Sequence, residues 1–94
     1  MIIYIAHLAG PFGENKDIAR SIREQKIRPA LLARKQVTLD FIGMNGATQS
    51  FVHALLSELI REFGPDIFDS LTFKNCSDVV REVILTVSDY MQEV

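Results

Sequence analysis

Two patterns of hydrophobic residues alternate along this 94-residue chain: short runs typical of strands and longer runs with helical spacing. Short runs rich in β-branched residues predict three strands, over Ile2–Leu8, Gln36–Phe41 and Leu71–Lys74. Longer runs with apolar positions three and four residues apart predict three helices, over residues 15–28, 49–63 and 77–92. Because helical crossovers join parallel strands, this order predicts an α/β fold: a small layered domain with a mostly parallel sheet and helices packed on it.

Turn and capping residues set the expected element boundaries. Asn15 is a good N-cap for the first helix, and Pro29 should end or kink that helix near Arg28. Residues 30–33 are expected to form another turn, and residues 66–70 a connector with a helical turn. Glycine followed by proline at positions 64 and 65 ends the second helix. Asn75 or Ser77 is expected to cap the third helix.

The apolar stripes indicate one core in a single domain spanning residues 1–94. The second helix has Phe51, Leu55, Leu59 and Phe63 at intervals of four residues. The expected stripe of the third helix consists of Val80, Val83, Ile84, Val87, Tyr90 or Met91, and Val94. Three strands are few for a sheet. We therefore expect either a further strand pairing near the N-terminus or a homodimer that extends or covers the sheet edge.

Composition narrows the class of protein. With 48% hydrophobic and 23% charged residues, the chain has the composition of a globular domain. No apolar run approaches the ~20 residues that span a bilayer, so no membrane association is expected. The apolar N-terminus lacks the basic residues of a signal peptide. One cysteine, Cys76, excludes an internal disulfide and is typical of a reducing cytoplasm, where we expect the protein.

Charge is unevenly distributed. Residues 1–39 have seven basic and three acidic side chains, a net charge of +4, whereas residues 40–94 have a net charge of −6. The first helix contributes a basic set: Arg20, Arg23, Lys26 and Arg28. This set is interpreted either as a solvated helix face or as a contact surface for an acidic partner. A sequence pI near 5.6 argues against nucleic acid as the main ligand.

The segment from Val37 to Gly64 carries the main candidate site. A strand ends at Asp40, a glycine-spaced loop follows, and two hydroxyl residues, Thr48 and Ser50, begin an apolar helix. Backbone N–H groups at a helix start are unpaired and the helix dipole is positive there. The hydroxyls can therefore cap the helix, contact a partner or accept a phosphoryl group. Asp40 is expected to accept N–H groups of the loop from Gly43 to Ala47; the alternative is that it positions a kinase's metal or the adjacent hydroxyl.

Other polar residues give weaker signals. His7 and His53 are expected to be packed or surface histidines, and Cys76 a structural thiol. A Ser50–His53 pair could touch across one helical turn, but a hydrolase would also need a nucleophile elbow and an orienting carboxylate. The glycines match no nucleotide-binding motif, and a zinc site would need Cys76, both histidines and a carboxylate to converge. We therefore expect no enzymatic activity, no cofactor and no metal.

The chain resembles the STAS-like domain family, whose name refers to sulfate transporters and anti-sigma-factor antagonists. The resemblance is carried by Leu39-Asp40-Phe41, Gly43 and Thr48-Gln49-Ser50-Phe51, and by Phe73-Lys74-Asn75-Cys76 with the following helix. It extends from about Tyr4 to Glu93. It implies the α/β fold and a protein-binding role as a bacterial regulator, and some members of the family stand beside ATP-binding kinase-like proteins or DNA-binding domains.

The resemblance also implies a regulated surface at the start of the second helix. Anti-sigma-factor antagonists have an acidic residue and two serines before a glycine there, and a partner kinase phosphorylates one serine. Here Thr48 and Gln49 stand at the acidic and first serine positions, Ser50 stands at the second, and Phe51 replaces the glycine. The expected partner surface consists of Asp40, Gly43, Asn45, Thr48 and Ser50. The alternative function is a nucleic-acid or phage-defence accessory protein that uses the basic first helix.

Overall fold

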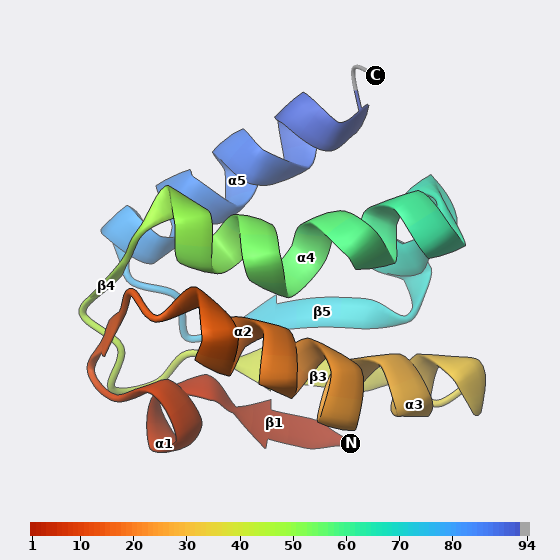
Figure 1. Ribbon diagram of the computed structural model, residues 1–94, viewed down its shortest axis with the longest axis horizontal. Coiled ribbons are helices and arrows are strands. Elements are labelled where there is room, and N and C mark those ends of the chain that lie inside the picture. Colours follow the sequence, from red (N-terminus) through yellow and green to blue (C-terminus); the bar gives the residue numbers. More distant parts are fainter. Residues whose placement is uncertain (93–94) are drawn as a thin grey trace.

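A parallel sheet forms the base of the domain. The computed structural model describes residues 1–92, and within them the strands β1 (Ile2–Tyr4), β3 (Val37–Asp40) and β5 (Leu71–Lys74) pair in the order β1-β3-β5 (Figure 1). Both pairings are parallel, so that Ile3, Leu39 and Phe73 lie at the same level of the sheet. The prediction of an α/β fold with a mostly parallel sheet is therefore confirmed, as are the second and third predicted strands.

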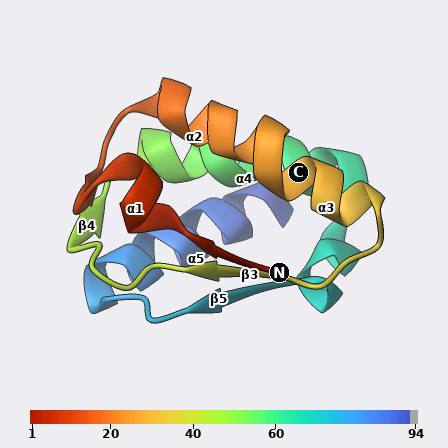
Figure 2. The same ribbon diagram turned by 90° about the horizontal axis from the view of Figure 1, so that it is seen from below.

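Three long helical segments connect or follow the strands. The first consists of α2 (Lys16–Ile22), the π-helix η1 (Arg23–Ile27) and α3 (Arg28–Leu32). The second is α4 (Gln49–Phe63), with the boundaries predicted from its apolar period, and the third is α5 (Asp78–Gln92). The α4 helix lies between α2 and α5 in Figure 1, and Figure 2 also shows α2 and α4 side by side. A short 3-10 helix, η2 (Pro65–Asp69), supplies the expected turn after α4.

The first predicted strand is too long. The chain leaves the strand after Tyr4 and forms the helix α1 (Ile5–Ala9). β-branched residues end at position 5, whereas the following Ala-His-Leu-Ala segment contains good helix formers. Gly10 ends the helix with a positive φ of 83°, and its N–H donates to the Ala6 carbonyl oxygen at 2.8 Å.

Pro29 does not end the first helix, contrary to one of the two predicted outcomes. The regular α-helical pattern is interrupted one turn earlier, in η1, where the Arg28 N–H donates to the Arg23 carbonyl oxygen five residues back. Proline lacks an N–H group and its ring clashes with the carbonyl of the preceding turn. A wider π turn directly before the ring relieves this clash, so the chain stays helical to Leu32.

A second, two-stranded sheet supplies a further strand pairing near the N-terminus, which was one of two expectations, but its residues were not predicted. It pairs β2 (Phe12–Gly13) with β4 (Gly46–Ala47) in parallel. Two further backbone bonds extend the contact: the Asn45 N–H donates to the Pro11 carbonyl at 2.7 Å, and the Thr48 N–H donates to the Gly13 carbonyl at 2.8 Å. This small sheet joins the loop before α2 to the loop before α4.

The core lies between one face of the main sheet and the helices. Ile3, Leu39 and Leu71 are buried on the covered face, whereas Ile2 and Tyr4 on the other face are 51% and 42% exposed. In α5 the stripe of Val80, Ile84 and Val87 is buried as predicted. Met91 continues this stripe instead of Tyr90, and the predicted Val94 lies outside the described residues. Within residues 1–92, no helix combines the length and apolar character needed to cross a bilayer.

Candidate functional site

A groove runs along the solvent-facing side of α4, between α2 and α5. We call it the α4 groove, and its volume is about 930 Å³. The first helical segment lines one wall, α4 forms the floor and α5 contributes the other wall. The lining residues are Lys16, Arg20, Arg23, Glu24, Arg28, Gln49, Ser50, His53, Ala54, Ser57, Glu58, Glu62, Val87 and Tyr90.

The fold explains why this groove begins where two helices start. The β1–β3 and β3–β5 pairs are parallel, so α2 and α4 run in the same direction across the sheet (Figure 1). The small β2–β4 sheet joins the two loops that precede them. A Cβ at Gly13 would lie 3.0 Å from the buried ring of Phe51 in α4, so a larger residue there would require this ring to shift. The loops thereby bring the N-termini of α2 and α4 to the same end of the groove.

The start of α4 has the geometry predicted from its hydroxyl residues. Thr48 is the N-cap, and its Oγ1 accepts the Phe51 N–H at 3.1 Å. Ser50 lies in the first turn, is exposed and lines the groove, as does His53 one turn later. Ser50 therefore presents a hydroxyl at the positive end of the α4 dipole, in a place that a partner can reach.

Three cations from the first helix line the same end and the middle of the groove. Lys16 and Arg20 are exposed, and Arg20 pairs with Asp17 at 3.2 Å on its own helix. Arg23 differs from them, because its side chain is only 11% exposed. Its Nη1 donates to the Ala54 carbonyl of α4 at 2.9 Å, and its Nε donates to Glu24 at 2.9 Å. Arg23 thus fastens the first helical segment to α4.

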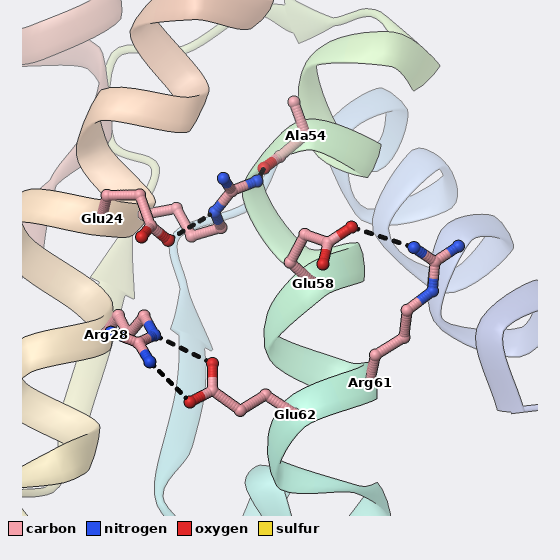
Figure 3. A network of polar contacts seen from close by, with 7 residues as sticks. Glu24, Arg28, Ala54, Glu58, Arg61 and Glu62 are labelled. Carbon is pink, nitrogen blue, oxygen red and sulfur yellow. Dashed lines mark hydrogen bonds and ion pairs between the residues drawn. The ribbon is translucent and has the colours of Figure 1, made fainter.

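The other end of the groove is closed by ion pairs, which Figure 3 shows. Arg28 donates two hydrogen bonds of 2.9 Å to the two carboxylate oxygens of Glu62. The hydrogen bond from Arg28 lowers the pKa of Glu62, and the pKa of Arg28 is raised by the same bond. Glu58 pairs with Arg61 at 2.9 Å within α4. Each carboxylate at this end therefore has a cation beside it.

The predicted basic set does not act as one surface. Arg20, Arg23 and Arg28 line the α4 groove, but Lys26 lies against β1 and α1, in a smaller pocket with Met1, Tyr4 and His7. The π turn changes the rotation of the helix between Arg23 and Arg28, so simple helical spacing could not place Lys26 correctly.

The predicted regulated surface is likewise divided. Ser50 lines the groove, whereas Asp40 is the last residue of β3 and Gly43 and Asn45 lie in the connection between β3 and β4. Asp40 is buried and accepts hydrogen bonds from the Ile42 N–H at 2.9 Å and from the Asn75 amide at 3.0 Å. The Asn75 bond, followed by the Ile42 bond, lowers the pKa of Asp40. Asp40 organises its loop, but with partners other than the predicted residues 43–47.

The remaining candidate residues lie away from the groove. His7 stacks on Tyr4 with a ring separation of 5.3 Å. Cys76 is a free, half-buried thiol after β5, and burial raises its pKa. In the described part of the chain, no group of three or more histidine, cysteine, aspartate or glutamate side chains is arranged to hold a metal ion.

Two features of the site escaped sequence reasoning. The Phe12-Gly13 strand that aligns the helix starts has only two residues, too few for a periodic signal. The groove floor includes three small residues, Ser50, Ala54 and Ser57, beside longer polar side chains of α4, and their spacing of four and three residues puts them on one face of the helix. The signal for this floor is present in the sequence as small residues opposite the apolar stripe.

The family comparison agrees with this architecture. A sequence model of the STAS-like domain of unknown function (DUF4325) matches residues 19–81, which extend from the middle of α2 to the first turn of α5. Neither the curated proteins nor the solved structures include one that matches the chain. The matched segment contains β3, β5, all of α4 and most of the groove. Because this sequence model covers more than half of the chain, the chain belongs to the family of STAS-like domains of unknown function.

Proposed function

We propose that this protein is a non-enzymatic bacterial regulatory domain that binds a protein partner through the α4 groove. Phosphorylation of Ser50 controls this binding, and the partner or its neighbour is a kinase-like ATPase of the cytoplasm. The observation that carries the proposal is that Ser50 and the cations of the first helix line one groove. Membership in a STAS-like family supports a role in regulation or interaction at the coarser level.

Electrostatics explain how a phosphoryl group would act at this position. It would add about −1.5 to −2 charges in the first turn of α4, where the helix dipole favours an anion. It would also place these charges opposite Lys16 and Arg20 in the same groove. A partner that uses those cations would then lose them, so phosphorylation is expected to weaken docking.

The nucleic-acid alternative finds less support in the same residues. Arg23 and Arg28 are two of the four basic residues on which it rests, and both already donate to oxygens of α4. Lys26 lies in a different pocket. Because two of the four basic residues are already hydrogen-bonded and a third lies elsewhere, the set can make few of the many phosphate contacts that nucleic-acid binding requires.

The test is affinity purification from the native host with wild type, Ser50→Asp and Ser21→Asp as baits, followed by mass spectrometry of bait and prey. Ser21 is an exposed serine of α2 outside the groove and is the matched control. We expect a partner with wild type and Ser21→Asp, its loss with Ser50→Asp, and a phosphopeptide containing Ser50. Equal recovery with all three baits and no phosphopeptide would refute control at Ser50.

A further inference from the structure

We infer that the partner segment that occupies the α4 groove is an amphipathic helix with acidic side chains along one edge. This inference rests on the proposed function and adds the chemistry of the partner. It follows from the shape of the groove, from the side chains on its floor and from the distribution of its charges.

The shape favours a helix. From Ser50 to Glu62 the groove follows α4 for twelve residues, which corresponds to about 18 Å at ~1.5 Å per residue. Helices recognised in grooves place side chains at intervals of three and four residues along the surface that they contact. In this groove an apolar stripe would meet Ala54, Val87 and Tyr90, and the flanks of the helix would meet the polar lining.

The floor and the α5 wall offer both apolar and polar contacts. Tyr90 is 62% exposed, and its ring gives an apolar wall with a polar tip above the buried Val87. Ser57 is only 2% exposed yet lines the groove.

The two ends of the groove differ in charge, and this difference determines the charge expected on the partner. At the end where α2 and α4 begin, Lys16 and Arg20 are exposed and the α4 dipole is positive. At the other end, Glu62 and Glu58 are paired with Arg28 and Arg61. Among the described residues Lys16 is in no ion pair, so Lys16 and the α4 dipole leave positive charge at the end where α2 and α4 begin, and an edge of glutamates or aspartates complements it. Such a partner competes with Asp17 for Arg20.

The test uses two synthetic helical peptides with the same apolar stripe, one with glutamates and one with lysines along its edge. Binding is measured by NMR titration against wild type, the double variant Lys16→Glu/Arg20→Glu, and the control Lys26→Glu, whose position lies outside the groove. We expect wild type and control to bind the acidic peptide, with shifts at Ser50, Ala54 and Ser57. The double variant should lose about tenfold or more in affinity for it and prefer the basic peptide.

Two results would overturn the inference: the acidic peptide fails to bind wild type, or charge reversal leaves its affinity unchanged. The failure of the proposed function is distinguishable from both. If Ser50→Asp abolishes capture of the cellular partner but Lys16→Glu/Arg20→Glu does not, the regulatory function stands and the acidic helix is refuted. If the acidic peptide binds as expected but Ser50→Asp changes nothing in the cell, the groove accepts helices without control at Ser50.

Discussion

The two ends of the α4 groove are built from similar residues but pair their charges differently. At the end where α2 and α4 start, Lys16 is exposed, the ion pair of Arg20 is with Asp17 of its own helix, and no carboxylate of α4 lines the groove among the described residues. At the other end, Arg28 reaches across and binds both oxygens of Glu62. Cations that reach α4 hold the helices together, whereas those that do not are available to a partner.

Arg23 marks the boundary between these two ends. It is the most buried of the groove cations for which a pair is described, and it bonds to a backbone carbonyl of α4 as well as to the carboxylate of the adjacent Glu24. The comparison teaches that basic residues on one helix cannot be assigned a role by charge alone. Their role depends on which hydrogen-bond acceptors the neighbouring helix offers. Several substitutions can test this difference between cations that are bonded to α4 and cations that are not.

The largest effect is expected from Arg23→Ala. This variant removes a nearly buried charged donor from the Ala54 carbonyl and should lower the free energy of unfolding by about 2 kcal/mol. Urea denaturation measures it. Arg61→Ala is the control, since that guanidinium is exposed and pairs only within α4, and it should cost less than about 0.5 kcal/mol. If both variants lost a similar free energy of unfolding, the hydrogen bond from Arg23 to the Ala54 carbonyl would not stabilise the fold as predicted.

A smaller effect is expected from Thr48→Ala at the start of α4. The variant leaves the Phe51 N–H without its capping oxygen, so the free energy of unfolding should fall by ~1 kcal/mol. Ser50→Ala, two residues later, removes a hydroxyl without a capping role and should leave stability nearly unchanged. If Ser50→Ala were the more destabilising of the two, Ser50 would be structural and less available for regulation.

Glu62→Gln tests the closed end through its pH dependence. The pKa of Glu62 is lowered in the folded state by its bond to Arg28, so the pair stabilises the fold above the unfolded-state pKa. This stabilisation disappears as the pH falls through the folded-state pKa. Glu62→Gln should therefore be less stable than wild type at neutral pH, and the difference should vanish in acid. A difference that stays constant down to about pH 3 would contradict the pairing.

The smallest effect on stability is expected at the open end. Lys16→Gln/Arg20→Gln removes two exposed cations and should change the free energy of unfolding by less than about 0.5 kcal/mol. The same urea experiment measures it. A substantial loss would mean that these cations also hold the helices together, and the division between the two ends would be lost.

Sequence patterns predicted those parts of the molecule whose signal is local. The bounds of α4 follow from four-residue spacing of phenylalanine and leucine and from the stop at Gly64-Pro65. The N-terminal segment was assigned wrongly because Ile2–Ile5 is rich in β-branched residues although only Ile2–Tyr4 is a strand. The expected homodimer at the sheet stays a prediction, and the exposed Ile2 and Tyr4 lie on the uncovered face.

The site was predicted in pieces, and its assembly was not. Ser50 and the basic residues were both candidates, but their meeting in one groove depends on the β2–β4 pairing and on the direction of two crossovers. The separation of Lys26 from Arg23 and Arg28 depends on the π turn before Pro29. These are contacts between distant segments, which residue spacing within one helix does not encode.

The most direct test of the central claim is the dissociation constant of the captured cellular partner, measured by calorimetry for wild type, Ser50→Asp and Ser21→Asp. If the open end of the α4 groove is the regulated docking site, Ser50→Asp should weaken binding by about tenfold or more, or ~1.4 kcal/mol. Ser21→Asp, which adds the same charge outside the groove, should leave the constant within about twofold. Equal dissociation constants for all three proteins would show that the partner docks elsewhere.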